Sequence, residues 1–133
     1  MSTSRSAAAY QSQAVGTATG PQLLIMLYDR LAVDISRAEI AIESADFEGT
    51  NEALQHAQRI VRMLRTSLDP DGFVGGQDLL ALYVFLEEHL VRANLEKDVV
   101  KVRECADLVQ PLHEAWRRAI DESERDNVAS DVG

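Results

Sequence analysis

Residues 23–28 read Leu-Leu-Ile-Met-Leu-Tyr and begin a segment of helical periodicity that extends to about residue 43. Six successive apolar residues cover about one and a half turns of an α-helix, so their side chains point to all sides of it. One hydrophobic core covers only one side of a helix. The stretch therefore predicts either a central helix or a helix whose second face is covered by a partner.

The helix expected at about 21–44 has two apolar edges when its residues are placed at intervals of about 100°. The wider edge is the expected core stripe, which contains Leu24, Leu27, Tyr28, Leu31, Ile35, Ala38 and Ile42. Met26, Val33 and Ile40 lie almost opposite, and charged residues separate the two edges. Two interpretations stay open: neighbouring helices bury both edges, or the second edge is a docking surface for another chain.

Apolar periodicity predicts three further helices, at about 47–68, 77–96 and 99–120. Asp46 and Asp98 stand where their side chains can cap the second and the fourth of the four helices.

The helix expected at about 77–96 repeats the two-edged pattern, because Leu80, Val84 and Val91 form a second apolar edge beside its core stripe. Pro111 lies inside the last helix. We expect it to kink or unwind that helix, since proline has no amide donor and its ring clashes with the preceding turn.

The pattern of elements predicts an all-α fold, an antiparallel up-and-down four-helix bundle with a mobile N-terminal arm. Residues 1–19 are rich in Ser, Thr, Ala and Gln without a sustained period, which is typical of such an arm. Residues 20–120 are expected to form the bundle domain, and residues 121–133 a disordered acidic tail. Tyr10 and Val15 are isolated apolar residues in the arm that can pin it to the bundle.

Composition excludes several functional classes. The formal net charge of -9 argues against a nucleic-acid partner, whose phosphates are bound by clustered Lys and Arg. No stretch approaches the ~20 apolar residues of a membrane span, and no signal peptide is visible, so we expect a cytoplasmic protein without membrane insertion. The single cysteine, Cys105, fits a reducing cytosol and is expected to be a buried packing residue.

No recognisable catalytic or metal-binding pattern occurs in the sequence. His56, His89 and His113 occur singly, without a second His or Cys at the spacing of metal ligands. Residues 69–72 match only the beginning of a calcium loop, whose other ligands are missing. There is no Gly-rich phosphate loop and no nucleophile elbow. We therefore expect no enzyme activity, no metal and no cofactor, and a protein that binds others through apolar edges.

Three separated blocks carry a resemblance to a known family. The first comprises Tyr10, Val15-Gly-Thr-Ala-Thr and Leu23-x-x-Met26-Leu27-Tyr28. The second comprises Leu79-x-x-Leu82-Tyr83 and Leu90-x-x-Ala93-Asn94, and the third is Ala115-Trp116. From about Tyr10 to Ile120 the chain resembles the FliS family of flagellar export chaperones. It departs from the family pattern at Gly20, which precedes Pro21, and at Arg30, which follows Asp29.

The resemblance implies a cytoplasmic chaperone that binds the C-terminal, otherwise disordered segment of flagellin, prevents its premature polymerisation and delivers it for type III export. It also implies the flagellar export gate and regulatory co-chaperones as partners. Combined with the two-edged pattern, it predicts client grooves built from Met26, Val33, Ile40, Leu80, Val84 and Val91. The resemblance further suggests that Tyr10 and Val15 form a displaceable N-terminal cover. The alternative is a self-associating helical scaffold or regulatory protein that uses the same edges without a client.

Overall fold

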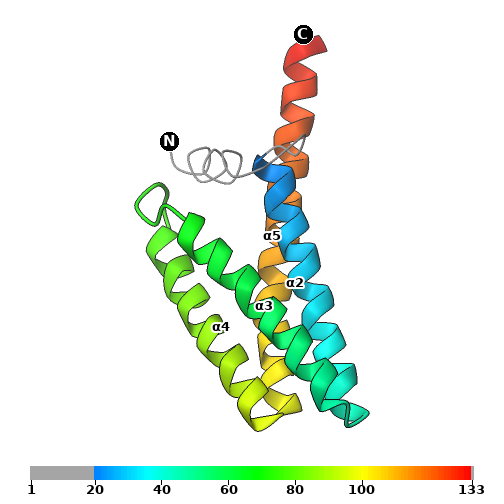
Figure 1. Ribbon diagram of the computed structural model, residues 1–133. Coiled ribbons are helices and arrows are strands. Elements are labelled where there is room, and N and C mark those ends of the chain that lie inside the picture. Colours follow the sequence, from blue (N-terminus) through cyan, green and yellow to red (C-terminus); the bar gives the residue numbers. More distant parts are fainter. Residues whose placement is uncertain (1–19, 133) are drawn as a thin grey trace.

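Four helices make up the part of the chain that is described, residues 20–132 of a computed structural model. With the labels of Figure 1, they are α2 (Gly20–Glu43), α3 (Phe47–Ser67), α4 (Gly76–Glu96) and α5 (Val99–Val132). No strand occurs among these residues, so the predicted all-α fold is confirmed. The bounds of α2, α3 and α4 agree with the predicted helices to within one residue.

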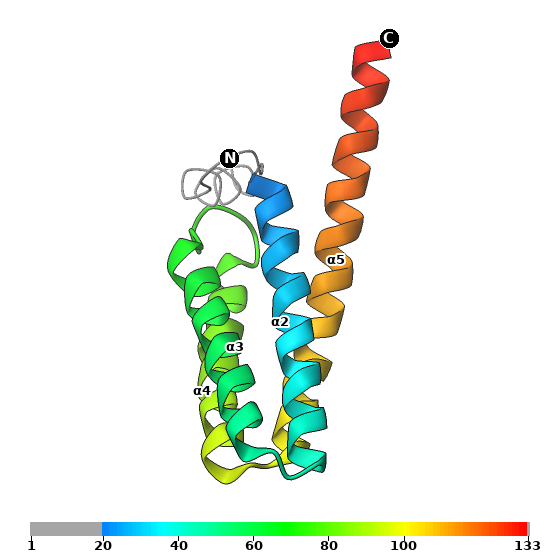
Figure 2. The same cartoon turned by 45° about the vertical axis from the view of Figure 1, so that its right-hand side comes forward.

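The helices pack side by side in the order α2, α3, α4, α5, with consecutive helices antiparallel (Figures 1 and 2). α2 packs against α3 and α5, and α4 packs against the same two helices. Short connectors at 44–46, 68–75 and 97–98 force this up-and-down arrangement. As a result α2 and α4 occupy diagonal corners of the bundle.

The core is aliphatic, with one pair of tyrosines at its centre. The expected core stripe of α2 does face inward, since all its members are buried or packed partly buried against the core. The Tyr28 and Tyr83 hydroxyls lie 2.6 Å apart and form a buried hydrogen bond between α2 and α4. The largest fully buried side chains also include Leu31, Ile35, Leu54, Leu64, Leu86 and Leu90.

Two predicted caps and one glycine fix the connectors. The Asp46 side chain accepts a hydrogen bond from the Gly49 amide at 2.9 Å, and Asp98 accepts one from the Val100 amide at 2.9 Å. Both caps are therefore confirmed. At Gly76, a Cβ atom would lie 2.1 Å from the Pro70 carbonyl oxygen. Only glycine allows the connector to approach the start of α4 so closely.

α5 differs from its prediction in two respects. It is one continuous helix through Pro111, so the expected unwinding there does not occur. Val109 and Trp116, on either side of the proline, both pack on the core and hold the helix across it. The helix also extends past Ile120 to Val132 and projects beyond the other helices (Figures 1 and 2). Its predicted end at 120 is wrong, because an acidic segment without an apolar period contains no stop signal.

Candidate functional site

The α2 edge lies on the outward side of α2. We define it as Met26, Val33 and Ile40. Their side chains are 57%, 41% and 65% exposed, whereas the opposite side of the helix is in the core. The interpretation that neighbouring helices bury both edges is therefore wrong for this helix. Arg30 and Arg37 occupy the positions between the three apolar residues at helical spacing, so the outward stripe alternates between apolar and basic side chains.

A similar stripe lies on α4. We call it the α4 edge and define it as Leu80, Val84 and Val91. Val84 and Val91 are 40% and 37% exposed, and Leu80 is half-buried. Glu87 belongs to the same stripe and reaches across to α3. Its carboxylate accepts hydrogen bonds from Arg65 Nε at 3.0 Å and Arg62 Nε at 3.2 Å. The α4 edge therefore borders α3.

The two edges do not form a single groove, because α2 and α4 occupy diagonal corners of the bundle (Figure 1). Each edge is accompanied by side chains that approach α3: Arg30 and Arg37 on α2, and Glu87 on α4. A polypeptide that contacts both edges by this side has to cross α3. This geometry fits an extended partner better than a compact one.

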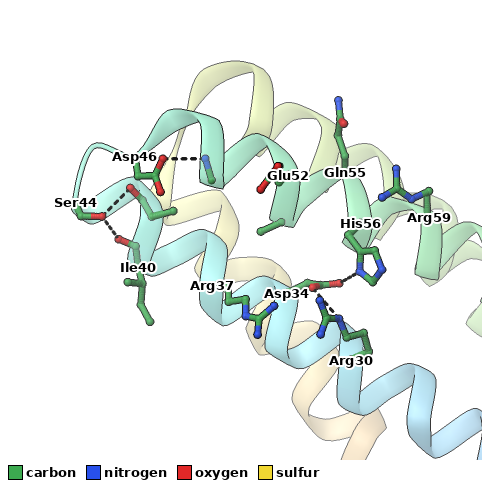
Figure 3. Close-up of a pocket in the computed structure, with 13 residues that line it drawn as sticks. Arg30, Asp34, Arg37, Ile40, Ser44, Asp46, Glu52, Gln55, His56 and Arg59 are labelled. Atoms are coloured by element: carbon green, nitrogen blue, oxygen red, sulfur yellow. Dashed lines mark hydrogen bonds and ion pairs between the residues drawn. The ribbon is translucent and has the colours of Figure 1, made fainter.

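A pocket of about 590 Å³ opens between the C-terminal half of α2 and the N-terminal half of α3 (Figure 3). Ile40 of the α2 edge lies at its rim, close to the turn that joins the two helices. Three arginines line it, Arg30 and Arg37 from α2 and Arg59 from α3. The pocket thus extends the α2 edge toward α3, and most of the residues that line it are polar or charged.

Asp34 forms the polar centre of this pocket and is only 1% exposed. One of its carboxylate oxygens forms an ion pair with Arg30 Nε at 3.2 Å, and the other is paired with His56 Nδ1 of α3 (Figure 3). A buried carboxylate requires such partners, because burial without them costs several kcal/mol. The contact joins α2 to α3 and leaves both oxygens of Asp34 occupied.

A smaller hollow of about 350 Å³ lies beside the first turns of α2. Met26 of the α2 edge lines it together with Ile25 from α2 and Ile120 and Arg117 from α5. Tyr10 and Val15, the predicted cover, fall outside the described residues. Their assignment stays a prediction.

The other two histidines also contact carboxylates on neighbouring helices. His89 Nε2 of α4 lies 3.0 Å from Glu104 Oε1 of α5, and His113 Nε2 of α5 lies 2.6 Å from Asp29 Oδ1 of α2. Within residues 20–132, no group of three or more His, Cys, Asp or Glu side chains is placed to hold a metal ion. The histidines therefore act as links between helices.

Cys105 is buried in the core, as predicted. Burial, with a smaller contribution from the Glu104 carboxylate, raises the pKa of its thiol to about 12. A thiol with such a pKa is protonated at neutral pH and is a poor nucleophile.

Among the described helices, none is both long and apolar enough to cross a membrane.

Comparison with known proteins identifies the family. A family model described as "Flagellar protein FliS" matches residues 2–123. The chain belongs to the FliS family. Its FliS relatives include the flagellar secretion chaperone FliS of Bacillus subtilis (strain 168), which is 34% identical over 122 residues, 92% of this chain and 91% of the relative. The flagellar secretion chaperone FliS of Escherichia coli (strain K12) is 32% identical over 109 residues, 80% of each chain.

FliS membership confirms the resemblance carried by the three sequence blocks, and it supports a chaperone role in flagellar export.

Sequence reasoning missed the pocket between α2 and α3. It placed Asp34 among the charged residues that separate the two apolar edges, although the side chain is buried against His56, 22 positions away. It also left out Phe85 and Leu95, which are exposed on α4. No local pattern reports a pairing between two helices, so only the packed bundle reveals it.

Proposed function

We propose that this FliS protein is a cytoplasmic chaperone that binds the disordered C-terminal segment of flagellin, prevents its polymerisation and delivers it for flagellar type III export. The observation that carries the proposal is the exposure of the α2 and α4 edges in a member of a chaperone family. Apolar stripes that remain uncovered on a folded bundle mark a surface for a partner.

The chemistry of the surface suits a disordered client. Such a segment loses conformational entropy when it is ordered, so it binds with low affinity per unit area and needs a long contact. Two edges on different faces of the bundle provide that length. The predicted client residues are Met26, Val33, Ile40, Leu80, Val84 and Val91.

The N-terminal arm and the other partners complete the proposal. Tyr10 and Val15 act as a displaceable cover for part of the client path. The flagellar export gate and regulatory co-chaperones bind the loaded chaperone at other surfaces. No catalytic step is part of this role.

The test is a calorimetric titration of the purified protein with a peptide of the flagellin C-terminal region from the same organism. The double variant Val33→Asp/Ile40→Asp places two charges on the α2 edge without altering the core. We expect binding to weaken at least about 100-fold, because each buried apolar side chain contributes about 1.5–3 kcal/mol. The helical circular dichroism signal should stay at the wild-type level.

The matched control is Val74→Asp/Val100→Asp, which makes the same change of charge at two exposed valines outside both edges. It should bind the peptide like the wild type. If the edge variant binds normally, the α2 edge is not a client site. If its helical signal collapses, these residues support the fold.

The same exposed edges support one alternative, a self-associating scaffold without a client. Light scattering over a range of concentrations separates the two functions. A stable dimer that persists when the flagellin peptide is added would favour the scaffold. A monomer that forms a complex with one peptide favours the chaperone.

A further inference from the structure

We infer that the pocket between α2 and α3 binds an acidic residue of the client, whose carboxylate sits between Arg37 and Arg59 while an adjacent apolar residue packs on Ile40. This inference rests on the proposed function and adds a charge requirement to the client. It assigns a role to a pocket that neither apolar edge explains.

The first argument is that neither guanidinium group has an ion-pair partner among the described residues. Arg30 is the arginine that reaches Asp34, and His56 occupies the second oxygen of that carboxylate. Arg37, one turn beyond Asp34 along α2, forms no ion pair with it in the described part of the chain. In the described part of the chain, neither Arg37 nor Arg59 forms an ion pair, although both line the same pocket (Figure 3).

The second argument is the contrast with other arginines at helix contacts. Arg62 and Arg65 share Glu87, Arg103 pairs with Glu39, and Arg117 pairs with Asp29. Arginines between helices in this bundle are thus normally neutralised across the contact. The pocket departs from that pattern, because it presents two unpaired guanidinium groups from two different helices.

The acidic residues that line the pocket leave room for a further carboxylate. Asp34 is already paired with Arg30 and His56, and Asp46 caps α3 through the Gly49 amide. Glu52 lies on the same side of α3 but forms no ion pair with either arginine. Three arginines and three carboxylates line the pocket, and Arg37 and Arg59 are the two arginines that pair with none of these carboxylates.

Charge complementarity identifies the occupant. A guanidinium group offers a planar fork of donors that matches a carboxylate, and two such forks facing one pocket favour an Asp or Glu side chain. Ile40 is the most exposed residue of the α2 edge and lines the same pocket, so an apolar neighbour of that acidic residue has a surface to cover. The chain as a whole is acidic, so the two unpaired arginines also direct an acidic segment to one place.

The experiment compares two double charge reversals in the full chain. Arg37→Glu/Arg59→Glu alters the pocket. Arg92→Glu/Arg118→Glu is the matched control, because both residues are exposed, form no ion pair in the described region and lie outside the pocket. The probe is the flagellin C-terminal peptide of the same organism, titrated at low and at high salt.

We expect the pocket variant to bind at least about tenfold more weakly than the control, because reversal replaces attraction by repulsion. The difference should shrink at high salt. Replacing each acidic residue of the peptide by Lys in turn should identify one peptide that binds the pocket variant more tightly than the unmodified peptide does.

Each other result overturns the inference in a distinguishable way. An equal loss of peptide affinity in the pocket variant and in the control variant would show a general effect of net charge. Normal binding by the pocket variant would remove the charge requirement but leave the proposed function intact. Absence of binding by the wild type would overturn the proposed function itself, and the inference with it.

Discussion

Tyr28 and Tyr83 connect two helices whose backbones are not neighbours in the bundle. α2 and α4 lie on a diagonal, yet the two hydroxyls meet at 2.6 Å in the core. Burial raises the pKa of Tyr28, and the hydrogen bond with Tyr83 acts in the opposite direction. Both tyrosines belong to the sequence blocks of the family resemblance, and the structure gives them this shared role.

Removing the Tyr28 hydroxyl should measure that link. Tyr28→Phe is expected to lower the free energy of unfolding by about 1 kcal/mol, the usual net value of a buried hydrogen bond. Urea unfolding of this variant, of Tyr83→Phe and of the double variant gives a double-mutant cycle. The losses of unfolding free energy in the two single variants should not add up in the double variant, because each single change removes the same hydrogen bond between the two hydroxyls. Strictly additive losses would show that the hydroxyls act independently.

Cys105 should make stability fall at alkaline pH. The unfolded thiol ionises near its ordinary pKa of 9.0, whereas the folded thiol keeps its proton up to about 12. Its contribution is therefore fully present below pH 9 and is lost as pH rises toward 12, because the unfolded state then binds fewer protons. Urea unfolding between pH 9 and pH 10.5 should show a fall of up to about 1.4 kcal/mol per pH unit that is missing in Cys105→Ala. Equal slopes for the two proteins would contradict this assignment.

At the scale of elements, the helices were predictable because their signals are local. Apolar periodicity and the Asp46 and Asp98 caps locate them to within about one residue, except at the end of α5. The course of α5 was not predictable, because packing of Val109 and Trp116 holds the helix across Pro111. The separation of outward from core residues on α2 was visible in the periodicity, but their exposure depends on the neighbouring helices.

Pro111 remains a cost to α5 even though the helix is continuous. A proline inside a helix removes one backbone hydrogen bond and strains the preceding turn. Because Pro111 is exposed, Pro111→Ala should raise the free energy of unfolding by roughly 1–3 kcal/mol without loss of packing. Thermal unfolding followed by circular dichroism measures the gain. Gln110→Ala, at the adjacent exposed position, is the control and should change stability by less than about 0.5 kcal/mol.

A neutral or destabilising effect of Pro111→Ala would contradict this view of α5. It would mean that the bundle uses a local distortion at the proline for its packing. The control variant would then separate this effect from a general change at the exposed surface of the helix.

At the scale of the whole molecule, the diagonal placement of α2 and α4 determines what the bundle can bind. The predicted up-and-down topology already places α2 and α4 on a diagonal, but how far each edge is exposed depends on packing. Two edges on different faces, and a pocket between α2 and α3, suit a long and flexible client. That Arg37 and Arg59 form no ion pair in the described part of the chain was likewise beyond the sequence, since pairing across helices leaves no local pattern.

The most direct test of the chaperone function is the growth of flagellin filaments in the presence of increasing amounts of this protein. Purified monomeric flagellin from the same organism is seeded, and filament growth is followed by light scattering. The account predicts that growth falls in proportion to the added protein and stops near one molecule per flagellin, whereas Val33→Asp/Ile40→Asp has little effect. Unchanged filament growth at a several-fold excess of the wild-type protein would contradict it.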